Sequence, residues 1–129
     1  MTQPARRSAQ KSGALLAALL CLAATAGCSR AGAGPTGAGL CWRASADGRD
    51  FDAVAASAPN LESCAAYLER LHLVEGGPVN GAFQGRLIFV TAAEVTASAS
   101  AGSHRYRVFQ PKERAEIDAA IRSLIAEGR

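Results

Sequence analysis

The spacing of apolar side chains predicts a first amphipathic helix directly after Asn60. Apolar residues there recur at the i, i+3, i+4, i+7 positions that share one helix face: Leu61, Cys64, Ala65, Leu68 and Leu71. Asn60 is suited to cap the helix N-terminus, and the run Gly76-Gly77-Pro78 is expected to end the helix. Cys64 should therefore point toward the interior.

A second helix is predicted from Pro111, which stands at the preferred first-turn position of a helix. Its expected buried stripe consists of Ile117, Ala120, Ile121, Leu124 and Ile125. Its outer side is expected to carry the i, i+4 ion pairs Lys112/Glu116, Arg114/Asp118 and Asp118/Arg122.

Between the two helices the pattern changes to a period of two, which is typical of strands with one solvated face. From 79 to 90, the odd-numbered positions include Phe83, Leu87 and Phe89. The even-numbered positions include Asn80, Gln84 and Arg86. Gly85 indicates a hairpin turn or a bulge, and Asn80-Gly81 is a second candidate turn. Further strands are expected at 40–43, 94–98 and 104–109, whereas 51–58 is ambiguous.

These elements predict an α+β fold in a single small domain over residues 40–129. We expect an antiparallel sheet of three to four strands with both helices on one face, in the order β-α-β-β-(β)-α. A domain of this size has only a modest core, so a covalent cross-link would contribute a large share of its stability.

The N-terminal region has the three parts of an export signal, which we place at residues 1–27. A basic stretch with Arg6, Arg7 and Lys11 precedes an apolar run over 14–24, and small residues follow the run. The run is too short for a transmembrane helix, because its length covers roughly half of a ~30 Å hydrocarbon core. We therefore expect an exported protein.

The motif Thr25-Ala26-Gly27-Cys28 resembles the lipobox of bacterial lipoproteins. The resemblance implies that Cys28 is acylated with diacylglycerol and becomes the N-terminus, and that Ser29 directs the protein to the outer membrane, facing the periplasm. The Gly/Ala-rich residues 28–39 would then be a flexible tether. The alternative is ordinary cleavage after Ala26, which would leave a soluble periplasmic or secreted protein.

The cysteine count supports export. The chain has four cysteines, of which Cys21 lies in the signal and Cys28 is the proposed lipid site. Cys41 and Cys64 remain as one pair, which predicts a disulfide in an oxidising compartment. Their spacing fits neither a Cys-x-x-Cys redox motif nor paired zinc ligands, so we expect no metal site.

The charge balance argues against a nucleic-acid partner. Three of the 14 basic residues lie in the signal, so residues 28–129 carry 11 basic and 11 acidic side chains. A neutral domain lacks the concentrated positive charge that nucleic-acid binding requires. No Walker loop, dinucleotide fingerprint or Gly-x-Ser-x-Gly elbow occurs in the sequence, so no cofactor is expected.

One cluster of residues is a candidate binding site for an anionic ligand or an acidic partner. It consists of Arg86, Arg105 and Arg107 with His104 and Tyr106 close by in sequence. If the strands at 86–90 and 104–109 are neighbours, the guanidinium groups converge and suit a carboxylate or a phosphate. The alternative is an exposed sheet face that is kept soluble by its charges.

Two classes of function remain open from the sequence. The first is a non-enzymatic envelope protein, anchored in the membrane by its lipid, that serves as a binding or structural module for another envelope protein or an anionic ligand. The second is a small soluble periplasmic enzyme that uses His72 or His104 with a carboxylate. The two classes differ in whether a histidine and a carboxylate meet in a pocket.

Overall fold

The computed structural model describes residues 32–129, so the predicted signal peptide and Cys28 lie outside the described residues. Its strands are β1 (Cys41–Ala44), β2 (Phe51–Ala55), β3 (Val79–Phe83), β4 (Arg86–Val90), β5 (Val95–Ser98) and β6 (Tyr106–Arg107). Its helices are α1 (Leu61–Glu75) and α2 (Pro111–Ala126). Neither helix is long and apolar enough to cross a membrane.

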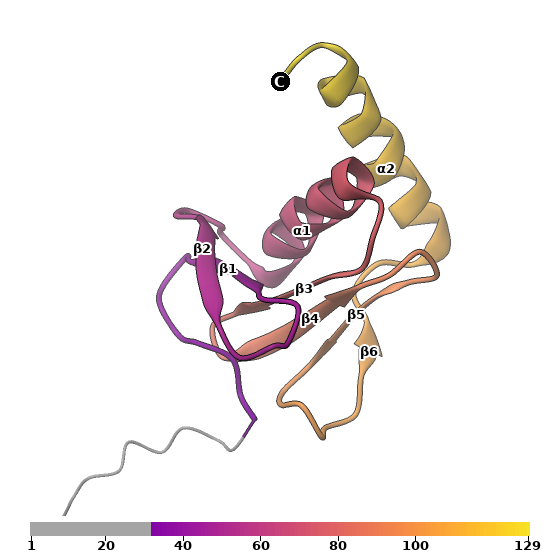
Figure 1. Ribbon diagram of the computed structural model, residues 1–129. Coiled ribbons are helices and arrows are strands. Elements are labelled where there is room, and N and C mark those ends of the chain that lie inside the picture. Colours follow the sequence, from indigo (N-terminus) through magenta and orange to yellow (C-terminus); the bar gives the residue numbers. More distant parts are fainter. Residues whose placement is uncertain (1–31) are drawn as a thin grey trace, which may run out of the picture.

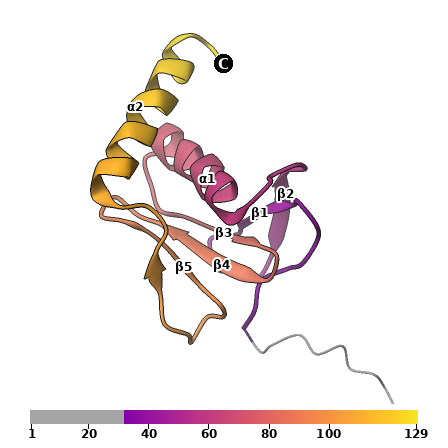
Figure 2. The same ribbon diagram turned by 180° about the vertical axis from the view of Figure 1, so that it is seen from behind.

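The strands form one antiparallel sheet in the order β2-β1-β3-β4-β5-β6. Figure 1 and the reverse view in Figure 2 place both helices on the same side of this sheet. The α+β prediction is confirmed. The predicted strand count and order were wrong, because the sheet has six strands, the ambiguous segment 51–58 contains β2, and the order is β-β-α-β-β-β-β-α.

The turns explain part of this difference. The Asp47-Gly48 turn folds β2 back onto β1, with a backbone hydrogen bond from the Ser45 N–H to the Asp50 carbonyl at 2.8 Å. Positive φ angles of 47° at Gln84 and 83° at Gly85 form the β3–β4 hairpin turn. The predicted hairpin at Gly85 is therefore confirmed.

The second candidate turn, Asn80-Gly81, was wrong because both residues lie inside β3. Gly81 is instead a point of close approach between the sheet and α1. A Cβ atom at this position would lie 2.5 Å from the Leu68 Cδ1 atom. The glycine therefore allows α1 to pack directly on the centre of the sheet.

The turn at 84–85 also changes which side chains face the helices. Phe83 pairs with Arg86 rather than with Leu87, and directly opposed residues share a sheet face. The helix-covered face therefore carries Phe83, Ile88 and Val90, which belong to the core. The expected shared face of Phe83, Leu87 and Phe89 was wrong, since Leu87 and Phe89 lie half-buried on the opposite, uncovered face.

We call this uncovered side of the sheet the open face. Cross-strand pairing places on it Trp42, Ala44, Phe51, Ala82, Leu87 and Phe89. No helix of the described chain covers it (Figure 1). Gly34, in the segment that enters the domain, lies on this side against the Ala82 and Leu87 side chains.

Helix α1 follows its sequence signals closely. The Asn60 side chain accepts a hydrogen bond from the Ser63 N–H at 2.8 Å, and Gly76 ends the helix in the left-handed conformation. Cys64, Ala65 and Leu68 are fully buried against the sheet. The predicted disulfide joins Cys64 to Cys41 on β1, with their Cα atoms 5.3 Å apart.

Helix α2 begins at Pro111 as expected, but its predicted buried stripe was mostly wrong. Ile121 is buried and Ile117 packs partly against the core, whereas Ala120, Leu124 and Ile125 are exposed. Figure 1 shows the reason, because the C-terminal part of α2 extends beyond α1 and away from the sheet.

A buried ion pair fixes α2 to the rest of the domain. The Glu69 carboxylate on α1 is fully buried and accepts hydrogen bonds from Arg114 of α2 at 2.9 and 3.2 Å. Arg114 also donates to the carbonyls of Thr91 and Ala92 at 2.6 and 3.2 Å. The expected Arg114/Asp118 ion pair was therefore wrong, because the guanidinium group turns inward to Glu69 and the β4–β5 turn.

The Glu69 carboxyl should make stability depend on pH. Burial and the neighbouring Asp118 raise the pKa of Glu69 above its ordinary value of 4.5, although Arg114 opposes the shift. The folded state then holds a proton that the unfolded state releases, so stability falls as the pH rises from 4.5 through the raised pKa.

We expect Glu69→Gln, which cannot titrate, to remove this part of the pH dependence. Urea unfolding of both proteins at a series of pH values measures it. The stability of the unsubstituted protein relative to the variant should increase as the pH falls toward the ordinary carboxyl pKa. A constant difference between the two would contradict the assignment.

Residues 32–39, which we expected to belong to the tether, contact the domain. The Gly34 N–H donates to the Gly85 carbonyl at 2.9 Å, and the Gly85 N–H donates to the Pro35 carbonyl at 3.0 Å. Ala101 donates to the Gly32 carbonyl at 2.9 Å. Residues 32–35 are therefore held between the β3–β4 turn and the β5–β6 loop.

Candidate functional site

The sheet separates the arginines of the predicted basic cluster. Strand β5 lies between β4 and β6, so Arg86 and Arg107 are not on neighbouring strands. The register also aligns Tyr106 with Ala97 and Ile88 on the helix-covered face. Arg107 instead aligns with Thr96 and Phe89 on the open face. The expected convergence of the three arginines was therefore wrong.

On the open-face side, each arginine has its own contact. The Arg105 guanidinium stacks over the Phe89 ring, 3.6 Å from its centroid. Arg107 forms an exposed ion pair with Glu94 at 3.6 Å, which contributes little to stability. His104 is exposed in the loop before β6.

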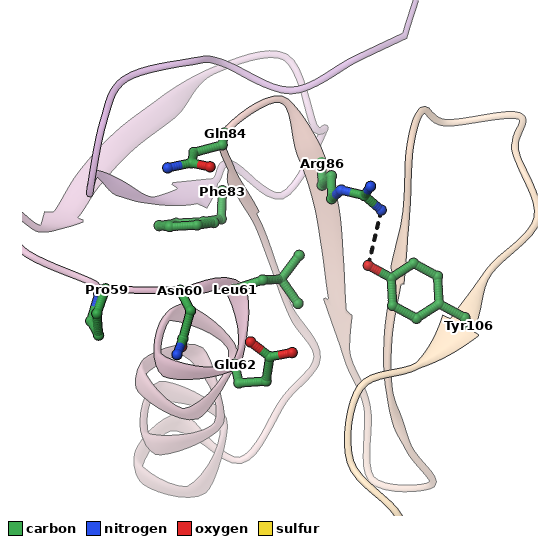
Figure 3. A pocket seen from close by; sticks show the side chains of 8 residues that line it. All are labelled: Pro59, Asn60, Leu61, Glu62, Phe83, Gln84, Arg86 and Tyr106. Carbon is green, nitrogen blue, oxygen red and sulfur yellow. Dashed lines mark hydrogen bonds between the residues drawn. The ribbon is translucent and has the colours of Figure 1, made fainter.

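Arg86 and Tyr106 do come together, at the edge of the helix-covered face. The Arg86 guanidinium donates to the Tyr106 hydroxyl at 3.1 Å (Figure 3). Both side chains line a pocket of about 310 Å³. The full lining consists of Pro59, Asn60, Leu61, Glu62, Phe83, Gln84, Arg86 and Tyr106.

Three separate parts of the chain build this pocket. The first turn of α1 supplies Leu61 and Glu62, the β3–β4 hairpin supplies Phe83 and Arg86, and β6 supplies Tyr106. The Asn60 cap fixes where α1 begins and thereby sets the position of Glu62. In Figure 3, Leu61 and Phe83 lie between the helix and the hairpin, while the Glu62 carboxylate and the Arg86 guanidinium sit on different sides of the opening.

The two charges of the pocket are not neutralised by each other. Within residues 32–129, neither Arg86 nor Glu62 belongs to an ion pair. The pocket thus offers one cation, one anion, a phenol hydroxyl and the apolar surfaces of Leu61 and Phe83. Sequence reasoning identified Arg86 and Tyr106 but did not include Glu62 in the candidate site.

The histidines occupy other surroundings. The His72 Nδ1 atom lies 2.6 Å from the Gly77 carbonyl oxygen, close to the C-terminus of α1. In the described part of the chain, no hydrogen bond or ion pair joins His72 or His104 to a carboxylate. No group of three or more metal-ligating side chains occurs among these residues either.

Comparison of the chain with family models, curated proteins and solved structures found no match. The assignment of a function therefore rests on the pocket, the open face and the N-terminal motif.

Proposed function

We propose that the chain is an exported, non-enzymatic lipoprotein of the bacterial envelope that binds a small zwitterionic ligand. Acylated Cys28 anchors the protein in the membrane, and the pocket at Arg86 holds the ligand. The Cys41–Cys64 disulfide supports export, because such bonds persist in oxidising compartments. The lipobox-like motif at residues 25–28 supports the anchor.

The observation that carries the binding function is that Arg86 and Glu62 line one pocket without pairing with each other. A guanidinium group binds a carboxylate through two parallel hydrogen bonds. The Glu62 carboxylate is suited to an ammonium group, and Leu61 and Phe83 offer contact for aliphatic atoms. An amino acid or a short peptide carries all of these groups.

A multiply charged anion fits the pocket less well. Phosphate would gain Arg86 and the positive end of the α1 dipole but would face repulsion from Glu62. We therefore expect free amino acids and dipeptides to bind in preference to inorganic phosphate.

The ligand class is tested by calorimetric titration of the protein with amino acids and dipeptides. We expect Arg86→Gln and Glu62→Gln each to weaken binding by about ten- to a hundredfold, since each removes a charge-assisted hydrogen bond worth about 1.5–3 kcal/mol. Arg107→Gln, on the open face, is the matched control and should leave the affinity unchanged.

Two results would contradict this assignment. Binding that survives Arg86→Gln would place the ligand elsewhere. Phosphate binding that strengthens in Glu62→Gln, with no amino-acid binding in the unsubstituted protein, would make the pocket a simple anion site.

The anchor is tested by the intact mass of the protein purified from bacterial membranes. We expect a chain that begins at Cys28, carries acyl groups and gains two hydrogens on reduction of its disulfide. Cys28→Ser should release the protein from the membrane fraction. A soluble chain that begins at Gly27 or Cys28 without lipid would refute the anchor.

A further inference from the structure

We infer that the open face of the sheet lies against the lipid bilayer in the anchored protein. The inference rests on the proposed acylation of Cys28, and it adds an orientation that the acylation alone does not provide. The partner of the open face is the headgroup region of a membrane that contains anionic lipid. Three features of the structure support it: where the chain enters the domain, how short the preceding segment is, and what the open face presents.

The chain enters the domain across the open face. The Gly32 carbonyl accepts a hydrogen bond from Ala101, and the Gly34 N–H donates to Gly85. A Cβ atom on Gly34 would lie 2.6 Å from the Ala82 Cβ atom and 3.1 Å from the Leu87 Cδ2 atom. The backbone at Gly34 therefore rests directly on two open-face side chains.

The segment between this attachment and the lipid is short. Only four peptide units separate Cys28 from Gly32, and a fully extended chain spans at most about 3.6 Å per residue. The point of attachment therefore lies within about 14 Å of the acylated residue. A freely flexible tether over 28–39 would have allowed a larger separation and any orientation.

The surface around the attachment suits a membrane interface. Ala101, which fixes Gly32, also lines a groove of about 210 Å³ on the open face with Phe51, Leu87, Phe89 and Arg105. Arg105 lies flat on Phe89 and belongs to no ion pair within residues 32–129. Aromatic and aliphatic groups beside a cation match the boundary between acyl chains and anionic headgroups.

This orientation is compatible with ligand binding. The pocket at Arg86 lies on the helix-covered side of the sheet, where α1 begins (Figure 3). With the open face toward the bilayer, the pocket faces the aqueous compartment. The two faces of the sheet would then have separate roles.

The orientation is tested with a chain that begins at Cys28 and carries a lipid attached to that residue through a maleimide. Cys28 is the only free thiol of this chain, because Cys41 and Cys64 are bonded to each other. The protein is placed in vesicles of phosphatidylcholine and phosphatidylglycerol with brominated acyl chains. Trp42 is first replaced by Phe, so that each variant has a single tryptophan. Fluorescence is then compared for Phe89→Trp on the open face and Tyr67→Trp, at an exposed position of α1.

We expect the brominated lipid to quench Phe89→Trp strongly and Tyr67→Trp weakly. If Phe89→Trp does not fold, Phe51→Trp reports on the same face with Arg105 left in place. Equal quenching at both faces, or no quenching on the open face, would overturn the inference. Loss of quenching on the open face is the result expected if another copy of the chain covers this face.

The anchor and the orientation fail in different ways. An unacylated Cys28 in protein purified from cells would overturn the proposed anchor and the orientation with it. Acylated protein whose open face is not quenched would overturn only the orientation. The mass measurement and the fluorescence measurement therefore separate the two proposals.

Discussion

Arg114→Ala is expected to destabilise the domain by about 3–5 kcal/mol, because it leaves the Glu69 carboxylate buried without its partner. The carbonyls of Thr91 and Ala92 also lose a donor. Urea unfolding, monitored by circular dichroism, measures the loss in the free energy of unfolding. Most surface substitutions on this domain should cost far less, because such changes stay within about 0.5 kcal/mol.

Arg122→Ala provides the matched control, since it removes an exposed arginine from the same helix. We expect it to change the free energy of unfolding by no more than about 0.5 kcal/mol. The double variant Glu69→Leu/Arg114→Met should recover much of the stability, because it removes both buried charges together. A loss in Arg114→Ala no larger than that in Arg122→Ala would show that the ion pair does not hold α2.

The ends of the helices were predictable because their signals are local. Asn60 caps α1 through the backbone N–H three residues later, and Gly76 ends it in a conformation that glycine adopts easily. Pro111 begins α2 for an equally local reason. In each case the deciding atoms lie within one helical turn of the residue that gives the signal.

The faces of the strands were less predictable, because they depend on turn geometry. A parity pattern read straight through 79–90 ignores the two residues of the turn at Gln84-Gly85, which pair Phe83 with Arg86. Leu87 and Phe89 therefore occupy the face opposite to Phe83. The period-two pattern predicted strands correctly, but the register reversed the face assigned to β4.

The candidate site was predictable only in part. Arg86 and Tyr106, which the sequence singled out, lie within hydrogen-bonding distance of each other. They meet across β5 at the edge of the sheet, not on adjacent strands, so Arg105 and Arg107 remain on the other face. Glu62 joins the pocket through the position of α1, which no spacing in the sequence reveals.

The burial of Glu69 illustrates the same limit. It directly follows Leu68, at the edge of the apolar stripe of α1, so the helical pattern places it near the core. Whether a carboxylate there is buried depends on Arg114, which is 45 residues away. The Glu69–Arg114 pair is a tertiary interaction. The i, i+4 spacing within the helix predicted a pair between Arg114 and Asp118 instead.

The second large effect is expected from the disulfide. The double variant Cys41→Ala/Cys64→Ala should lose about 3 kcal/mol, chiefly because the unfolded chain is no longer restricted by a closed loop of about 24 residues. The bond also joins β1 to α1 at a fully buried position. Replacing both cysteines avoids the free thiol that a single substitution would leave.

Reduction of the unsubstituted protein provides the matched control for the disulfide, since it opens the same loop without removing either sulfur atom from the core. Denaturant unfolding of the oxidised, reduced and double-alanine proteins should place the reduced protein close to the variant and well below the oxidised form. If reduction leaves stability unchanged while the variant is destabilised, the loss comes from packing around the buried sulfur atoms. A domain that stays equally stable in all three states would not need an oxidising compartment to fold, and the main structural support for export would be removed.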